Sequence, residues 1–137
     1  MNDYVEIKQL HGTDAQLYQL VAPLVMDPAV LKQNNNYPFR TSDRFEWLIA
    51  QSDERILGFI PIEHKASSNV INNYYIANRD ADLLALLIQE AIRVFPAQTL
   101  TAVVFRDDEE VFLRAGFTTE KRWTLYVKMK KEPAYAK

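Results

Sequence analysis

A single turn, residues 78–82 (NRDAD), has the residue types and spacing best suited to binding an anion. Arg79 supplies a cationic side chain there, and an apolar helical pattern begins at Leu83. The first main-chain N–H groups of a helix have no partners within the helix and attract anions. The turn also follows a strand-like segment, which is the position where open α/β folds bind ligands. The turn is therefore a candidate site for an anionic ligand, and the alternative is that Asp80 and Asp82 only cap the helix.

Two tyrosines just before the turn are the candidates for proton transfer. Tyr74 and Tyr75 carry phenols, whose unperturbed pKa is about 10. Either one is a candidate acid, and packing within a strand is the alternative role for both. The histidines, His11 and His64, stand apart without the spacing of metal ligands. We therefore expect proton chemistry without a metal, with His64 acting as a base only if it faces a cleft.

The elements that must position these groups form a strand–helix–strand unit. Residues 69–77 (NVINNYYIA) are rich in β-branched and aromatic types, which favour a strand. Residues 83–95 then place an apolar stripe at helical spacing and end before Pro96. Residues 99–105 (TLTAVVF) have the pattern of a buried strand. A unit of this length predicts two parallel strands joined by the helix.

The rest of the chain adds strands and short helices around this unit. Alternation predicts a strand at residues 4–10, a hairpin at residues 45–63 and one long final strand at residues 122–129. Pro61 within the hairpin suggests a bulge or an edge position. Two helices are expected between residues 14 and 33, and another ends at Ala115. The order β-α-α-β-β-β-α-β-α-β predicts an α/β fold (α+β mixed sheet) with helices on both faces.

Length and composition limit the function classes. The chain has 137 residues, 48% of them apolar and 25% charged, which fits one ordinary globular domain. We expect that domain at residues 1–131, followed by a polar tail at residues 132–137. A net charge of −2 argues against nucleic-acid binding, and no apolar run is long enough for a membrane helix. There are no cysteines, and a cytoplasmic location is expected.

The order of elements and the last third of the chain resemble the GNAT superfamily of N-acetyltransferases. Residues 111–131 (VFLRAGFTTEKRWTLYVKMKK) look like the ending of that family, with a short helix, the Gly116-Phe117 step and a final strand closing in lysines. The resemblance implies that two splayed strands hold the pantetheine arm of acetyl-CoA or another acyl-CoA. It also implies that the following turn holds the pyrophosphate and that the acyl group moves to a small-molecule or peptide amine. Such acyltransferases often form homodimers.

Carried over residue by residue, the resemblance implies a donor site and an acceptor site. The expected catalytic residues remain Tyr74 and Tyr75. The loop after the second helix implies substrate contacts from Tyr37, Phe39 and Arg40. The expected acyl-CoA contacts are Tyr75, Ile76, Ala77, Arg79, Asp82, Leu83, Leu84, Arg106 and Phe112.

The sequence departs from the family pattern at three places. The family's Gln/Arg-x-x-Gly-x-Gly/Ala turn falls on residues 79–84, where Arg79 agrees but Asp82 and Leu84 replace small residues. Phe112 stands where the family often has a tyrosine that acts as the acid and reprotonates the leaving thiolate. Residues 69–77 contain no glutamate to act as base. Two main readings stay open, and a third, donor binding with an unusual geometry through Arg79 and Arg106, lies between them. One is acyl transfer by direct attack of an amine on acyl-CoA, and the other is a catalytically degenerate fold that acts as a non-enzymatic interaction or regulatory module.

Overall fold

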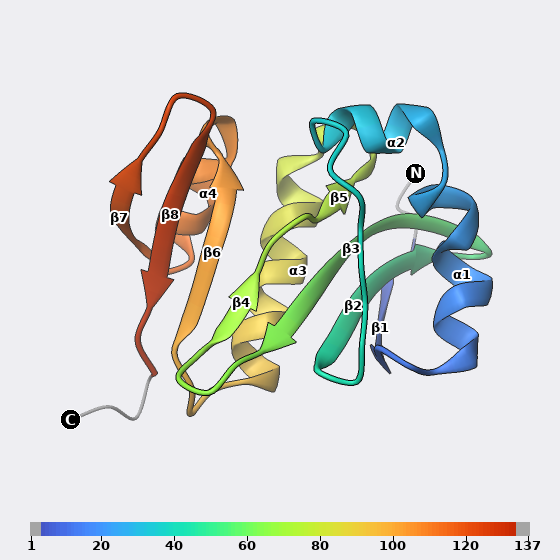
Figure 1. Ribbon diagram of the computed structural model, residues 1–137, viewed down its shortest axis with the longest axis horizontal. Coiled ribbons are helices and arrows are strands. Elements are labelled where there is room, and N and C mark those ends of the chain that lie inside the picture. The colour runs from blue at the N-terminus through green and yellow to red at the C-terminus, as the bar shows by residue number, and fades with distance from the viewer. Residues whose placement is uncertain (1–3, 134–137) are drawn as a thin grey trace.

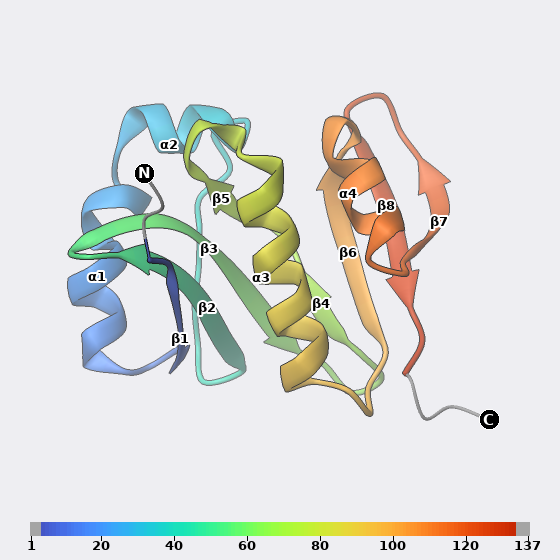
Figure 2. The same ribbon diagram turned by 180° about the vertical axis from the view of Figure 1, so that it is seen from behind.

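A computed structural model describes residues 4–133 as one mixed β-sheet with helices on both faces (Figures 1 and 2). Helices α1 and α2 lie on one face, and Figure 2 shows α3 and α4 on the other. This arrangement confirms the predicted fold class. Part of the predicted domain and tail, residues 1–3 and 134–137, lies outside the described residues. The elements are β1 (Glu6–His11), α1 (Ala15–Val25), α2 (Pro28–Gln33), β2 (Phe45–Ser52), β3 (Arg55–His64), β4 (Asn69–Ile71), β5 (Tyr75–Ile76), the short 3-10 helix η1 (Ala77–Arg79), α3 (Ala81–Val94), β6 (Leu100–Phe105), η2 (Arg106–Asp108), α4 (Glu109–Arg114), β7 (Thr118–Arg122) and β8 (Tyr126–Lys131).

The sheet order is β1-β2-β3-β4-β6-β8-β7, and β5 pairs with β3 alone. Strands β4 and β6 run parallel, from Asn69↔Leu100 to Ile71↔Ala102. Every other pairing within residues 4–133 is antiparallel. The predicted pair of parallel strands joined by a helix is therefore confirmed, with α3 as the connection.

The strand predicted at residues 69–77 is broken in two. Residues 72–74 separate β4 from β5, and Asn73 has a φ of 61°, a left-handed value that asparagine tolerates better than most residues. Along β3 the partners jump from Ile62↔Ile71 to Phe59↔Tyr75, so the break inserts one extra residue. Pro61 of β3 lies opposite this break, where its missing N–H costs no bond to β4 or β5. The irregularity that Pro61 suggested is thus in the neighbouring strand.

The prediction of a single long final strand was wrong. The chain forms a hairpin of β7 and β8 instead, and Trp123 and Leu125 lie in its turn, 42% and 58% exposed. Val127 and Met129 of β8 are fully buried. The apolar alternation of β8 therefore extends backwards along the chain into the turn before this strand. The edge strand β7 is polar and shows almost no apolar alternation.

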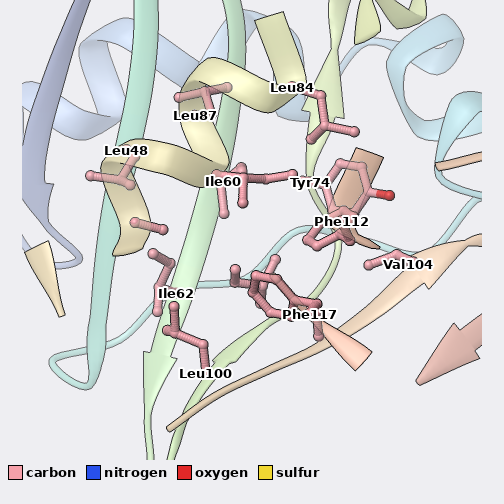
Figure 3. Packing of buried hydrophobic residues seen from close by; sticks show 14 of the residues in the cluster. Leu48, Ile60, Ile62, Tyr74, Leu84, Leu87, Leu100, Val104, Phe112 and Phe117 are labelled. Atoms are coloured by element: carbon pink, nitrogen blue, oxygen red, sulfur yellow. The ribbon is translucent and has the colours of Figure 1, made fainter. Parts of the chain in front are cut away.

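The sheet is buried on both sides by two hydrophobic clusters. Leu48 and Ala50 of β2 face the larger cluster under α3 and α4, whereas Trp47 and Ile49 face the smaller one under α1. The larger cluster also receives Leu84, Leu87 and Phe112 from α3 and α4, as Figure 3 shows. Gly116 follows α4 with a φ of +103°, a left-handed conformation that glycine adopts readily at the end of a helix.

Candidate active site

The central feature of the site is a slot between β5 and β6. Strand β6 pairs with β4 only as far as Ala102, and β5 pairs with β3 alone, so no main-chain ladder joins β5 to the last part of β6. The two chain segments diverge beyond the pair Ile71↔Ala102. A thin ligand could lie between these neighbouring parallel segments wherever side chains leave the gap free.

Tyr74 fills much of the slot. Its hydroxyl donates a hydrogen bond to Asp108 Oδ2 at 2.6 Å and accepts one from the Phe105 main-chain N–H at 3.3 Å. Its ring packs against Phe112, as Figure 3 shows, and against Phe105. The side chain is 4% exposed. The free space that remains is about 10 Å³. The chain's own side chains therefore bridge the slot in this structure.

The Tyr74–Asp108 pair is electrostatically unusual. Burial raises the pKa of Tyr74 well above 10, and the nearby charge and hydrogen bond of Asp108 raise it further. Burial likewise raises the pKa of Asp108 above its ordinary value, against the opposing effect of the Tyr74 hydrogen bond. A phenol with so high a pKa is a poor proton donor to a thiolate of pKa about 8.5. The geometry therefore favours packing over acid catalysis for Tyr74.

Arg79 spans the mouth of the slot. Its backbone has a φ of 51°, and that of Asn78 has a φ of 58°, both in the left-handed region that costs energy for residues other than glycine. From there the guanidinium lies 5.6 Å from the centre of the Phe105 ring and 3.8 Å from Asp107 Oδ2. Both partners of this ion pair are exposed, and exposed ion pairs contribute little to stability. The Arg79–Asp107 contact across the mouth of the slot is consequently weak.

The first turn of α3 is capped from within the chain. Asp80 Oδ1 accepts hydrogen bonds from the N–H groups of Asp82, at 3.0 Å, and Leu83, at 3.3 Å. These are the amides that would otherwise be free to meet a phosphate. Asp82 is exposed at this end, and Leu83 and Leu84 are buried in the core. The predicted anion site at this turn is therefore partly occupied by a carboxylate.

A larger cavity of about 590 Å³ adjoins the slot and shares Gln33, Arg79 and Phe105 with it. One wall comes from α2 and the residues after it, and the other from η2 and the β7–β8 turn, which flank the ends of β5 and β6 (Figure 1). Asn35 reaches across and donates a hydrogen bond to the Tyr126 hydroxyl at 2.6 Å. The cavity is lined by Lys32, Gln33, Asn35, Arg79, Phe105, Arg106, Asp107, Glu109, Thr124 and Leu125.

The predicted donor contacts are divided among these regions. Ile76 and Leu84 line the slot with Tyr74 and Arg79, and Arg106 lines the larger cavity. Ala77 begins η1 at the end of β5. The Ile76 N–H donates to Gln33 Oε1 at 3.3 Å, so it points to the slot side of β5. Within β5, this main-chain N–H therefore donates its hydrogen bond to a side chain and not to a neighbouring strand.

Two further predicted residues pack against the protein core, one fully buried and the other, Tyr75, half-buried. Phe112 is fully buried against Tyr74 and Phe117, and it lines neither the slot nor the larger cavity. Tyr75 packs against Phe59 of β3 at a centroid distance of 5.6 Å, and burial raises its pKa, followed by the charge of Asp27. Tyr74 and Tyr75 thus face opposite sides of the sheet.

The predicted substrate residues do not line the larger cavity. Phe39 packs edge-on against Phe59 at 5.1 Å, and Arg40 pairs with Glu63 at 3.6 Å. Tyr37 is 58% exposed. The role of these three residues as substrate contacts stays a prediction, and the structure does not bring them together in one pocket.

The histidines lie outside both cavities that form the site. His11 Nδ1 contacts Glu46 Oε2 at 2.6 Å, and His64 Nδ1 contacts Asn69 Oδ1 at 2.7 Å. Within residues 4–133 no three potential metal ligands come together. None of the helices in this part of the chain is long and apolar enough to cross a membrane.

The site residues that come from elements distant along the chain were not predicted from the sequence. The residue type of Asp108 indicates only a helix cap, and Lys32, Gln33 and Asn35 belong to no motif. The Asp27-Pro28 pair does mark α2, with Asp27 capping Ala29 N–H at 2.8 Å. It gives no indication that the far end of that helix faces the slot, because this depends on how α2 packs over the sheet.

Comparison with solved structures gives a consistent set of neighbours. ElaA from Escherichia coli matches with a TM-score of 0.69 and 12% identity, over 94% of this chain and 100% of ElaA. An acyl-CoA N-acyltransferase from Pseudomonas aeruginosa matches with a TM-score of 0.70 and 16% identity, over 93% of this chain and 99% of the other.

A GNAT family acetyltransferase from Elizabethkingia anophelis, with acetyl-CoA bound, matches with a TM-score of 0.57 and 14% identity, over 96% and 99% of the two chains. No family sequence profile matches the chain, and no curated protein sequence does so significantly. At these identities the likeness concerns the fold alone.

Proposed function

We propose, from the premise that this chain has the GNAT N-acetyltransferase fold, that it transfers an acyl group from an acyl-CoA to an amine. The observation that carries the proposal is the divergence of β5 from β6 after the short parallel pairing of β4 with β6. A structural neighbour with this fold was solved with acetyl-CoA bound. In this chain the pantetheine arm would enter the slot, and the amine would lie in the adjoining cavity of about 590 Å³.

Donor binding requires three rearrangements at the slot, the first being the parting of Tyr74 from Asp108, whose hydrogen bond of 2.6 Å bridges it. Arg79 must leave Asp107, which is an exposed contact at 3.8 Å and therefore weak. The Gln33 amide must also release the Ile76 N–H, a hydrogen bond of 3.3 Å. A carbonyl oxygen of the donor would then take the place of Gln33 Oε1 on that N–H. An amide N–H aimed at the thioester oxygen would stabilise the negative charge that develops there.

The chemistry needs little covalent help from the protein. A neutral amine attacks the thioester carbon, the C–N bond forms and the C–S bond breaks. The thiolate leaves without an acid because its conjugate thiol has a pKa of about 8.5. Asp108 lines the slot and is the candidate to receive the proton that the amine loses. Positioning of the two reactants supplies much of the acceleration.

Thermal melting with acetyl-CoA tests the donor half of the proposal. Ligand at 100 times its dissociation constant adds about 2.7 kcal/mol to the free energy of unfolding. For a chain of this length the expected rise in Tm is roughly 8–13 °C. ADP alone serves as a control for non-specific phosphate binding. Release of free CoA thiol in the presence of an amine panel then measures transfer. An unchanged Tm at millimolar acetyl-CoA would refute the proposed acyl transfer.

A second candidate function is favoured by the closed state of the site. Asp80 holds the N–H groups of Asp82 and Leu83, and Tyr74 bridges to Asp108. Both contacts stabilise a fold without a donor, as expected for a non-enzymatic interaction module. Such a module would keep its Tm in acetyl-CoA and release no thiol with any amine. The two measurements above therefore separate the candidates.

A further inference from the structure

The cavity beside the slot carries an excess of positive charge. Among its lining cations, Arg79 is paired with Asp107 at 3.8 Å. Lys32 and Arg106 have no ion-pair partner within residues 4–133, although both are exposed at the cavity wall. Two cations without counter-charges in a concave site favour an anionic ligand group.

The lining carboxylate Glu109 does not neutralise these cations. Glu109 accepts hydrogen bonds from Arg122 at 2.7 Å and from Thr119 at 2.5 Å, and its side chain is 14% exposed. Arg122, Thr119 and, more weakly, the charge of Arg106 hold the pKa of Glu109 below its ordinary value. Its negative charge is therefore already committed to Arg122, and Arg106 stays available to a ligand.

The position of these cations relates them to the acceptor rather than to the donor phosphates. Lys32 lies near the end of α2, and Arg106 lies in η2 at the end of β6. Helix α3, whose first turn is the expected phosphate position, lies on the opposite face of the sheet from α2 (Figures 1 and 2), and Arg79, two residues before α3, reaches the cavity from that side. The cavity opens into the slot through the shared Gln33 and Phe105. A ligand in the cavity can thus present its other end to the thioester.

We propose that the acceptor is an amine that also carries a carboxylate, held by Lys32 and Arg106, as in an amino acid. This inference rests on the proposed acyl transfer. Arg106 offers a planar pair of donors that matches a carboxylate, and Lys32 adds a second charge. The amino nitrogen then lies on the slot side, where Asp107 and Asp108 provide negative charge for the incoming ammonium form. Loss of one proton to Asp108 or to water gives the neutral amine. Its nitrogen forms the C–N bond as the C–S bond breaks, the nitrogen then releases a second proton to water, and the departing CoA thiolate takes a proton from water.

Matched acceptors give the first part of the test. Initial rates are measured at saturating acetyl-CoA with a series of L-amino acids and with the corresponding amides, which keep the amine but lack the carboxylate. The acids should have the lower KM, by roughly tenfold or more, as the loss of one charge-assisted hydrogen bond produces. Amides that are as good as the acids would overturn the inference.

Charge-removing variants give the second part. Lys32→Gln and Arg106→Gln should each raise the KM for the acid roughly tenfold, while the KM values for the amide and for acetyl-CoA stay unchanged. Arg114→Gln, which removes an exposed cation of α4 that pairs with Glu110 at 3.3 Å, is the matched control and should change none of them. A rise in the KM for acetyl-CoA instead would assign the cations to the donor phosphates and overturn the inference.

Direct binding separates this inference from the proposed function. Calorimetric titration of an amino acid and its amide into the protein without donor needs no catalysis. Selective binding of the acid, lost in Arg106→Gln, would support the anion site even if no acyl transfer occurs. Transfer to amines without any preference for the acid would leave the proposed function standing and refute the anion site. Absence of both transfer and acid-selective binding would refute both.

Discussion

Tyr74 and Asp108 link the two sides of the slot through side chains where the strands themselves do not pair. We expect Tyr74→Phe to lower the free energy of unfolding by about 1–3 kcal/mol, because it leaves the Asp108 carboxylate and the Phe105 N–H without this partner. Chemical denaturation measures the change. Tyr75→Phe is the control, since within residues 4–133 the Tyr75 hydroxyl makes no hydrogen bond, and it should have little effect. Equal losses in the two variants would contradict the structural role of the pair.

The ionisation of Tyr74 predicts a specific alkaline instability. Its pKa in the folded protein is raised well above 10 by burial and then by Asp108, whereas it is about 10 in the unfolded chain. The resulting stabilisation is fully present below pH 10 and is lost as pH rises through the folded value. Between the two values the free energy of unfolding falls by up to about 1.4 kcal/mol per pH unit from this group. The stability difference between the wild type and Tyr74→Phe should therefore shrink above pH 10, and a constant difference would contradict it.

Asp82 places an exposed carboxylate where the donor phosphates are expected. A unit charge at about 4 Å from another in water contributes roughly 1 kcal/mol, or about fivefold in binding. We therefore expect Asp82→Asn to lower the dissociation constant of acetyl-CoA several-fold, measured by calorimetric titration, and more so at low salt. Asp53→Asn is the control, because Asp53 lies in the β2–β3 turn with a φ of 55° that asparagine tolerates. Unchanged or weaker binding to Asp82→Asn would show that this carboxylate does not oppose the phosphates.

At the scale of elements, β5 depends on a close approach to β3. A Cβ added at Gly58 would lie 2.7 Å from the Tyr75 carbonyl oxygen and 3.2 Å from Ile76 Cδ1. Gly58→Ala must therefore displace β5, at a cost of about 1–3 kcal/mol, and should also weaken acetyl-CoA binding. Gly116→Ala is the matched control, because its strain arises from a φ of +103° after α4. It should lower Tm without changing donor affinity; an equal loss of affinity in both variants would contradict a role for β5.

The elements that sequence predicted well are those with a local cause. Helix α3 has an apolar stripe whose members Leu87, Ile88 and Ala91 are all fully buried. The parallel unit follows from the length of the α3 crossover. The β4–β5 break was missed because residues 69–77 have strand propensity throughout, although Asn72, Asn73 and Pro61 each weaken a continuous ladder. The final hairpin was missed because the apolar alternation at Trp123 and Leu125 runs through a turn.

The candidate site was only partly predictable for a related reason. Arg79, Ile76 and Leu84 are close in sequence, so a local motif brought them to one slot. Asp108 lines the same slot, and Lys32 and Leu125 line the adjoining cavity, only because α2, η2 and the β7–β8 turn pack around the same strand ends. No spacing along the chain encodes that meeting. The capping of α3 by Asp80 was a local prediction and is confirmed.

At the scale of the whole molecule, the sheet consists of two halves with a narrow junction. Strands β1 to β5 form one half and β6, β8 and β7 the other, and only the pairs from Asn69↔Leu100 to Ile71↔Ala102 join them by a main-chain ladder. Helix α3 and the Tyr74–Asp108 bond complete the junction. Widening the slot for a donor would therefore change the angle between the halves and part Tyr74 from Asp108, while each half keeps its own ladder bonds.

Donor binding should tie these halves together, and amide hydrogen exchange can follow it. Without ligand, β5 and η2 should exchange faster than β2 and β3, because they make few main-chain ladder bonds and lie next to open space. Saturating acetyl-CoA should slow exchange at β5 and η1 on one side and at η2 on the other, while β1, at the far edge, stays unchanged. Protection confined to one side of the slot, or to the exposed β7–β8 turn alone, would mean that the ligand does not lie between β5 and β6. The wild type in ADP is the control, since a ligand without the pantetheine arm has nothing to place in the slot.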